Sequence, residues 1–297
     1  MPETVPHLDR GVPANGHVRL LEAADLTALR ALADRDPLVN LFVRQRLSSR
    51  QNSGLGKAWL GTQWWGYVEN GRLVSACHIG SNIVPVAATS SAVEAFAMRL
   101  ARRDRRTGSL VGPSEAMTAM WERIEPAWGD ARSLRLHQPL LAISRNSRVA
   151  PDPAVRVLGV QELGQVYPVA VKMFSEEMGI HPDPQDSGAF RSRVRELLAA
   201  GLTIGIMEVG RQGPKVVFKA DVSVAMPDAA QLTGVWMAPE LRGRGFAAAA
   251  MAAVVQIVRA NVAPTVTLYV NDYNTVARRL YDRVGFEQIG EFGTVLL

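Results

Sequence analysis

The chain has 297 residues, a length that suits two domains of ordinary size. Hydrophobic residues make up 47% of it and charged residues 21%, a composition that excludes an intrinsically disordered chain. The formal charge of +5 is modest for this length and comes without a long run of like charges, so no nucleic-acid partner is indicated.

Export, membrane insertion and metal binding all lack a signal in the sequence. The single cysteine, Cys77, cannot form an internal disulfide, which favours a reducing compartment. The N-terminal residues carry charges and prolines in place of the apolar run of a signal peptide. The longest apolar stretch, 246–258, is too short to span a bilayer, and no Cys/His cluster predicts a metal site. We therefore expect a cytoplasmic protein that binds neither a membrane nor a metal.

The first half of the chain has the pattern of a small α/β domain. Residues 1–16 hold prolines and glycines without periodicity, so we expect a flexible leader. We expect a domain over 17–145, which opens with a strand at 18–21 and an amphipathic helical pattern. Asn70-Gly71 lies between two apolar runs and is a strong hairpin signal. Helical patterns then cover residues 92–103 and 114–124.

A cluster of Asn, Ser and Pro predicts a linker over 146–153, followed by a second domain over 154–297. The second domain opens like the first, with a strand at 155–158 and an amphipathic helical pattern, which suggests an internal duplication. Its strands first form a meander and then alternate with helices, which indicates a mixed sheet covered by helices. The predicted elements are a helix at 188–200, strands at 203–209, 216–223 and 230–237, a helix from Phe246, a strand at 265–270, a helix at 275–284, and one or two strands over 287–297.

A glycine-rich turn leads into the helix that begins near Phe246. Arg242-Gly243-Arg244-Gly245 precedes this helix and leaves backbone N–H groups uncovered at the positive end of the helix dipole, an arrangement that suits a phosphate. Gly245 has no Cβ and lets a ligand approach the backbone closely. Taken alone, so short a glycine pattern is more often a flexible turn before a helix.

A second motif follows in residues 268–286, LYVNDYNTVARRLYDRVGF. Together the two segments resemble the GNAT superfamily of N-acetyltransferases. The loop of that family is matched by Arg242, Gly245 and Ala247, and its downstream motif is matched by Asn274, Ala277, Leu280, Tyr281, Gly285 and Phe286. The resemblance covers residues 155–297 and implies acetyl-CoA as the acyl donor. We expect an α/β (α+β) fold of two GNAT-like domains in tandem, each a mixed, mostly antiparallel sheet flanked by helices.

The resemblance implies cofactor contacts residue by residue. The strand end Val235-Trp236-Met237 would pair its backbone with the pantetheine arm, and the Met237 amide would polarise the thioester carbonyl. Asn274 would bond to the cofactor arm, would act as the N-cap of the following helix, or would do both. The loop and the first helical turn would hold the pyrophosphate, through Arg242, Gly243, Arg244, Gly245, Phe246, Ala247 and Ala248.

The resemblance also implies an acid that protonates the departing thiolate, for which we expect Tyr281. A phenol suits this role because phenol and thiol pKa values lie within about two units of each other. The alternative for Tyr281 is a core residue whose hydroxyl is bonded locally.

The base that deprotonates the amine is less clearly marked. Glu177 is the first choice, because residues 174–184 are expected to cover the acceptor site. Glu176, Glu208 and Asp221 also lie on segments that line this site in similar proteins, no spacing singles out one of the four, and a water relay is a further alternative. His181 is expected to be a loop residue.

The first half is expected to be a degenerate copy that does not turn over acetyl-CoA. No Arg-x-x-Gly-x-Ala loop occurs between residues 18 and 145, and Pro113 removes a donor from the one loop that precedes a helix in a similar way. This half could wall one side of the acceptor site or offer an interaction surface. The tryptophans of this half are expected to pack in cores and interfaces: Trp59, Trp64, Trp65 and Trp121.

We therefore expect an N-acetyltransferase that acts on a primary amine, a small molecule or a peptide or protein amine, by direct attack in a ternary complex. One alternative is a mycothiol-synthase-like enzyme with a small amino-thiol acceptor. A tRNA-dependent aminoacyl ligase also uses paired GNAT-like domains, but the intact pyrophosphate loop argues against it. A non-catalytic acyl-CoA sensor would keep the loop and need no general acid. The acceptor and the oligomeric state stay open at this stage.

Overall fold

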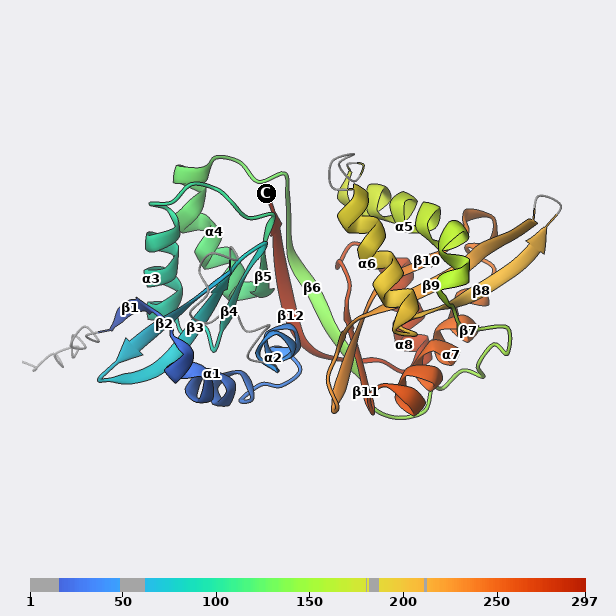
Figure 1. The fold of residues 1–297 in the computed structure, drawn as a ribbon, viewed down its shortest axis with the longest axis horizontal. Coiled ribbons are helices and arrows are strands. Elements are labelled where there is room, and N and C mark those ends of the chain that lie inside the picture. Colours follow the sequence, from blue (N-terminus) through green and yellow to red (C-terminus); the bar gives the residue numbers. More distant parts are fainter. Residues whose placement is uncertain (1–15, 49–61, 180, 182–186, 211–212) are drawn as a thin grey trace, which may run out of the picture.

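The computed structural model describes residues 16–48, 62–179, 181, 187–210 and 213–297, so Trp59 and nearly all of the predicted leader lie outside it. Within these residues twelve strands form one continuous mixed sheet. Figure 1 shows a lobe of helices and strands on each side of the two central strands, β6 (Ser133–Ile143) and β12 (Glu287–Leu296).

The first half of the chain supplies the elements of one lobe. Its remaining strands are β1 (His17–Leu20), β2 (Gln63–Glu69), β3 (Arg72–Ile79), β4 (Asn82–Val86) and β5 (Ser109–Pro113). Its helices are α1 (Leu26–Ala33), α2 (Leu41–Leu47), α3 (Ser90–Leu100) and α4 (Ser114–Trp128). The hairpin predicted at Asn70-Gly71 joins β2 to β3, and its two residues have positive φ angles of 49° and 75°, as a type I′ turn requires.

The second half repeats this set of elements. Its remaining strands are β7 (Arg156–Val157), β8 (Thr203–Gly210), β9 (Gly213–Ala225), β10 (Ala229–Met237) and β11 (Thr265–Tyr269). Its helices are α5 (Leu163–Met178), α6 (Ser187–Ala199), α7 (Phe246–Asn261) and α8 (Thr275–Val284). None of the described helices has the length and hydrophobicity needed to cross a membrane.

The strand order reveals an internal symmetry. It runs β1-β2-β3-β4-β5-β12-β6-β11-β10-β9-β8-β7. Each strand of the first half has an equivalent six places later in the chain, so that β1 corresponds to β7 and β6 to β12. When equivalent strands are exchanged, the strand order of the sheet reads the same in reverse. The two parallel pairs, β4–β5 and β10–β11, occupy equivalent places, and the other neighbours pair antiparallel. The predicted fold of two similar domains in tandem, each with a mixed and mostly antiparallel sheet, is confirmed.

The two halves interlock at the centre of the sheet. The last strand of the chain, β12, lies between β5 and β6 and pairs with both. One edge of β6 thus pairs with β12. The other edge of β6 pairs with β11 of the second half, from Ile143 with Val266 to Leu140 with Tyr269. Each half therefore uses a strand of the other to continue its sheet. The linker predicted at 146–153 and the domain boundaries around it stay a prediction.

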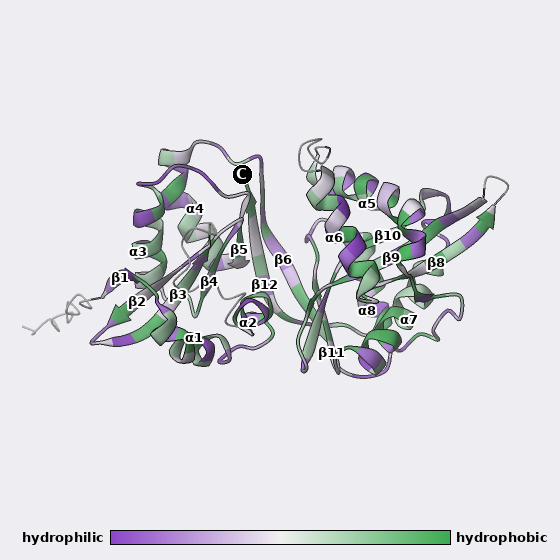
Figure 2. Ribbon diagram, in the orientation of Figure 1, coloured by the Kyte–Doolittle hydropathy of each residue, from purple (hydrophilic) through white to green (hydrophobic). Residues whose placement is uncertain are grey.

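Helices cover both faces of the sheet in each half. One core of the second half lies under α7 and α8 and includes Met251 and Val254, and another lies under α5 and α6 and includes Val166 and Leu198. The first half likewise has separate cores against α3 and α4 and against α1. In Figure 2, α5 and α6 carry both hydrophobic and polar residues, as expected of helices with one face on a sheet. Trp64, Trp65 and Trp121 are at most 3% exposed, in agreement with their predicted packing role.

Candidate active site

The candidate site lies where β10 and β11 separate. These strands pair from Ala229 with Thr265 to Gln231 with Thr267, and no further pairing joins them within the described residues. Beyond this point β10 stays on β9, whereas β11 stays on β6. A register shift in β10 between Thr233 and Trp236, with Gly234 at a φ of 61°, marks a bulge. A cavity of about 510 Å³ lies along this diverging pair.

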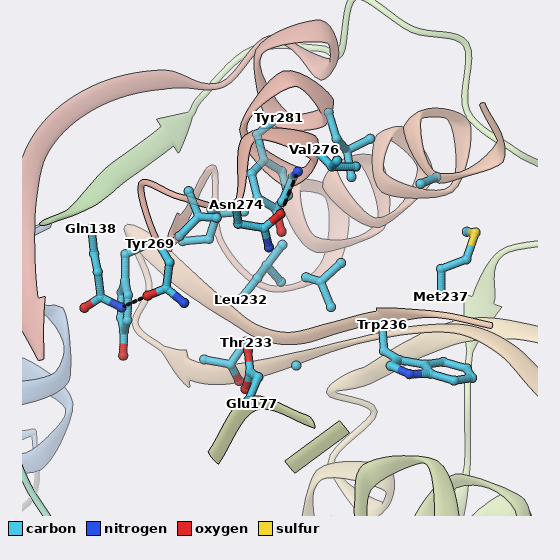
Figure 3. Close-up of a pocket in the computed structure, with 18 of the residues that line it drawn as sticks. Gln138, Glu177, Leu232, Thr233, Trp236, Met237, Tyr269, Asn274, Val276 and Tyr281 are labelled. Carbon is cyan, nitrogen blue, oxygen red and sulfur yellow. Dashed lines mark hydrogen bonds between the residues drawn. The ribbon is translucent and has the colours of Figure 1, made fainter. Parts of the chain in front are cut away.

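The end of β10 presents a backbone amide to the gap. The Ala238 amide donates to the Val217 carbonyl of β9 over 2.8 Å. Because N–H groups alternate between the two edges of a strand, the Met237 amide faces the opposite edge, towards β11. Arg242 Nε donates to the Met237 carbonyl oxygen over 2.9 Å, so the following loop fixes this strand end. Figure 3 shows the side chains of Met237 and Trp236 on opposite sides of the strand.

The loop before α7 forms one end of the cavity. The helix begins at Phe246, as predicted, and Gly245 is its N-cap in the left-handed conformation with a φ of 85°. Of the amides from Gly243 to Ala248, that of Ala248 donates to the Gly245 carbonyl over 3.4 Å, and the others have no partner among the described residues. Arg244 lies over the exposed Phe246 ring, 5.3 Å from its centre. The loop thus offers uncovered amides at a helix start, a site that favours an anion.

Asn274 begins α8 on the same cavity. Its Oδ1 accepts a hydrogen bond from the Ala277 amide over 3.1 Å, so its N-cap role is observed. The Asn274 Nδ2 has no partner among the described residues, and the residue lines the cavity. The predicted bond to a cofactor arm is compatible with this geometry and stays a prediction.

Tyr281 combines a core ring with an unpaired hydroxyl. The residue is 6% exposed, and its ring packs edge-on against Phe286 with 5.7 Å between the ring centres. The hydroxyl has no hydrogen-bond partner in the described part of the chain, although the residue lines the cavity. Burial, and to a lesser extent the charge of Glu177, raises the pKa of Tyr281 above the ordinary value for a phenol. The hydroxyl therefore keeps its proton throughout the neutral range.

Glu177 lies across β10 from Tyr281. Figure 3 shows Tyr281 and Asn274 on one side of the strand and Glu177 on the other, beside Thr233. Glu177 is the penultimate residue of α5, which ends at Gly179 in the left-handed conformation. Glu177 is exposed as a residue, yet partial desolvation of its carboxyl group by the surrounding protein raises its pKa, while the charges of Arg135 and Lys219 oppose that shift in part. A carboxylate with a raised pKa is a better proton acceptor than an ordinary one.

The other predicted carboxylates lie outside the cavity lining, within the described residues. Glu176 is 43% exposed and pairs with Arg242 at 3.4 Å. Asp221 lies on β9 opposite Thr233 of β10, has a side chain that is 14% exposed, and pairs with Lys219 at 2.5 Å. Glu208 is exposed on β8. His181 is an exposed residue whose Nδ1 lies 3.1 Å from Ser175 Oγ. Of the four candidates for the base, Glu177 alone lines the cavity.

The first half supplies cavity residues that the sequence did not reveal. Gln138 of β6 donates to Asn271 Oδ1 over 2.8 Å and accepts from the Thr294 hydroxyl over 2.6 Å. Tyr269 of β11 also lines the cavity, and burial raises its pKa. Further lining residues from the first half are Asn82, Ser109, Val111 and Arg135. These residues meet the second half only because β6 and β12 interlock, so no local sequence pattern could have placed them at the site.

The equivalent place in the first half is much smaller. Between β10 and α7 the connection comprises residues 238–245, whereas between β4 and α3 it comprises only residues 87–89. The Thr89 hydroxyl already accepts the hydrogen bond of the Ala92 amide at the start of α3, over 3.3 Å. Two cavities lie beside the ends of β4 and β5, of about 90 Å³ and about 200 Å³, against about 510 Å³ in the second half. These features support the prediction that the first half is a degenerate copy that does not turn over acetyl-CoA, which stays a prediction.

Comparisons with known proteins agree with this geometry. Residues 204–286 match the family model of the GNAT acetyltransferases, and residues 62–166 match a domain of unknown function, DUF4081. No curated protein matches the chain in sequence.

Solved structures share the fold along nearly the whole chain. A GNAT-family acetyltransferase from Colwellia psychrerythraea has 12% identity over 94% of this chain and 99% of its own, with a TM-score of 0.57. A GCN5-related N-acetyltransferase from Sphaerobacter thermophilus has 16% identity over 95% of both chains, with a TM-score of 0.59. A tandem GNAT protein from the clavulanic acid biosynthesis pathway has 14% identity over 95% of this chain and 98% of its own, with a TM-score of 0.54.

The family match covers β9, β10, β11, α7 and α8, which form part of the cavity and include the loop at Gly245 and the helix with Tyr281. The second half of the chain is therefore an acyltransferase domain of the GNAT family, joined to a first half that repeats its topology.

Proposed function

We propose that this protein transfers an acetyl group from acetyl-CoA to a primary amine by direct attack within a ternary complex. The observation that carries the proposal is the pair of proton-transfer groups, Glu177 and Tyr281, on opposite sides of one strand end. The Met237 amide, further along the same strand, faces the gap between β10 and β11. The three groups match the three needs of the reaction: a base for the amine, a donor for the oxyanion and an acid for the leaving thiolate.

The residues of the second half fit acetyl-CoA along the length of the cavity. The uncovered amides from Gly243 to Ala247 would hold the pyrophosphate, and the free edge of β10 would pair with the pantetheine arm as an added strand does. Asn274 Nδ2 would donate to the same arm. Acetyl-CoA supplies the activated acyl group, and the protein supplies orientation and proton transfer.

The proposed proton path uses the Glu177 carboxylate as the base and the Tyr281 hydroxyl as the acid. The Glu177 carboxylate takes the proton of the bound ammonium, so that the amine nitrogen can attack the thioester carbon. The Met237 amide donates to the carbonyl oxygen as its negative charge develops. When the carbon–sulfur bond breaks, the Tyr281 hydroxyl gives its proton to the sulfur. The cavity environment keeps that hydroxyl protonated until then.

Substitution of Gly245 tests the cofactor site. Gly245→Leu is expected to weaken acetyl-CoA binding at least 30-fold, because its side chain would stand where charge-assisted bonds to the pyrophosphate form, each worth about 1.5–3 kcal/mol. Gly71→Leu is the matched control, since Gly71 also has a positive φ and also has no atom within 4 Å of an added Cβ. Both variants carry similar backbone strain. Calorimetry should show the loss of affinity only at position 245, and equal affinities in the two variants would contradict the site.

Substitution of Glu177 tests the base. In the wild type, kcat/KM should fall as the pH drops through the raised pKa of Glu177, because protonation removes the base. Glu177→Gln is expected to lower kcat/KM about 100-fold and to abolish this acidic limb. Glu208→Gln, which alters an exposed carboxylate outside the cavity, is the control and should keep the wild-type profile. A Glu177→Gln enzyme with an unchanged pH profile would assign the proton transfer to water or another group.

A non-catalytic acyl-CoA sensor is the competing function. It would bind acetyl-CoA through the same loop without releasing CoA. Steady release of CoA thiol with a panel of primary amines distinguishes the two, since tight binding without release on any amine would favour the sensor. A mycothiol-synthase-like enzyme would instead release CoA with a small amino-thiol in preference to simple amines.

A further inference from the structure

The cavity contains a guanidinium that lacks a carboxylate partner. Arg135 of β6 lines the cavity from the first half, and no carboxylate lies within 4 Å of it among the described residues. Its Nη2 donates to the backbone carbonyl of Glu177, whereas its Nε is buried and has no hydrogen-bond partner. Arg135 as a residue is half-buried, but an unpaired buried N–H on a charged group is costly, and it indicates a ligand with the opposite charge.

The bond from Arg135 to Glu177 also has a structural role. The last carbonyls of a helix lack intrahelical donors, and an arginine often satisfies one of them. That role uses one of the five N–H donors that a guanidinium carries. It does not explain why the Nε is buried beside the cavity without an acceptor. A guanidinium with donors left unpaired can bind a carboxylate, which can accept two parallel hydrogen bonds.

The charges around the cavity restrict the kind of ligand. Among the described residues that line it, the only other cation is Arg242, which already donates to the Met237 carbonyl and to Glu176. In the same described lining, the only carboxylate is that of Glu177. One free cation beside one acid matches a ligand with one carboxylate and one ammonium group, whereas a phosphate dianion would call for more positive charge.

We infer that the acceptor amine carries a carboxylate close to its nitrogen, as an α- or β-amino acid does, and that Arg135 binds this carboxylate. The inference rests on the proposed function, in which Glu177 takes the proton of the amine. Arg135 bonds to the backbone of Glu177 itself, so the receptors for the two groups of the acceptor belong to two residues in contact. This closeness favours acceptors in which one or two carbons separate the nitrogen from the carboxylate.

Matched acceptor pairs test the inference. CoA release should be measured with L-alanine against ethylamine and with L-ornithine against putrescine, which differ by the carboxylate. The wild type is expected to favour the acid of each pair at least 10-fold in kcat/KM. Arg135→Gln should lower kcat/KM for the two amino acids about 100-fold, which is the equivalent of one charge-assisted bidentate contact. The same substitution should change kcat/KM for ethylamine and putrescine less than threefold. Arg135→Lys should restore part of the loss, and Arg145→Gln, at an exposed arginine paired with Glu287, should change neither.

Each other outcome is informative. An equal loss on acids and amines in Arg135→Gln would show that Arg135 only holds the end of α5, and a wild-type preference for the amines would also overturn the inference. If no acceptor releases CoA, the proposed function fails, and binding decides the inference alone. The CoA-saturated protein should then bind N-acetyl-L-alanine and not N-ethylacetamide in calorimetry, with the binding lost in Arg135→Gln. Equal binding of both compounds, or binding of neither, would overturn it.

Discussion

Tyr281→Phe is expected to lower kcat about 1,000-fold and to leave acetyl-CoA binding unchanged, since general acid catalysis contributes roughly 100- to 10,000-fold. The hydroxyl has no protein partner in the described structure, so its removal breaks no internal hydrogen bond. The ring would keep its contact with Phe286 and its place in the core. Steady-state CoA release, acetyl-CoA titration and urea unfolding would separate the loss of a proton donor from a loss of structure.

Tyr269→Phe provides the matched control. Tyr269 is the second phenol of the cavity, its pKa is also raised by burial, and its ring packs against Phe292 at 5.4 Å. Figure 3 places Tyr269 beside Gln138, on the side of the cavity that residues of the first half line, whereas Tyr281 lies beside Asn274. We expect Tyr269→Phe to change the KM of the acceptor and to leave kcat within a few-fold of the wild type. The reverse pattern in the two variants would assign the acid to Tyr269.

The direction of the Tyr281 shift adds a pH test. The acid must be protonated to act, so activity should be lost as the pH rises through its pKa. Because burial raises that pKa above the ordinary phenol value of about 10, no alkaline loss from this group should occur in the usual assay range. A wild-type alkaline limb below pH 9 that persists in Tyr281→Phe would report a different group.

The sequence predicted the second half well because its signals are local. The glycines at 243 and 245 both have the positive φ angles that only glycine adopts easily, and α7 begins immediately after them. Asn274 begins α8 as an N-cap, and Gly285 ends it in the left-handed conformation. Each of these features depends on a few adjacent residues, so the motif spacing was sufficient to place the loop and the helix.

The composition of the acceptor side could not be predicted in the same way. An alternating pattern marks β6 and β12 as strands, but it specifies neither their partners nor their register. Arg135 and Gln138 reach the site only through the pairing of β6 with β11, across more than 100 residues of chain. One buried feature did leave a local signal. Lys219 and Asp221 stand two apart in the otherwise apolar run 216–222, which puts them on one face of β9.

Lys219→Met is expected to lower the free energy of unfolding by about 3–5 kcal/mol, the usual cost of removing one partner from a buried ion pair. The Lys219 side chain is fully buried, and its Nζ donates to Asp221 Oδ2 over 2.5 Å and to the Gly234 carbonyl over 3.3 Å. Asp221 also accepts from the Thr203 hydroxyl over 3.0 Å. Without the ammonium group, this carboxylate would be left buried with one hydroxyl as its only described partner. Urea unfolding monitored by fluorescence and circular dichroism would measure the loss.

Two further variants distinguish the effect of breaking the buried ion pair from the effect of replacing a lysine on β9. Lys215 lies on the same strand as Lys219 and pairs with Glu240 at the surface. We expect Lys215→Met to cause little or no change in stability, because solvent screens such exposed pairs. The double variant Lys219→Met/Asp221→Leu removes both charges and should recover most of the loss, since replacing a whole buried pair by apolar residues is often neutral. Additive losses in the double variant would show that packing, and not charge pairing, determines the effect.

The same pair connects stability to the site. The bond from Lys219 to Gly234 holds the bulge at which β10 leaves β11, and the Lys219 charge lowers the pKa of Glu177 against the effect of burial. The double variant therefore should fold, yet its acidic limb of kcat/KM should move to higher pH, because Glu177 loses one of the two charges that support its ionised form. An unchanged limb in a folded double variant would mean either that Glu177 is not the base or that Lys219 does not reach it electrostatically, and Glu177→Gln distinguishes these two cases.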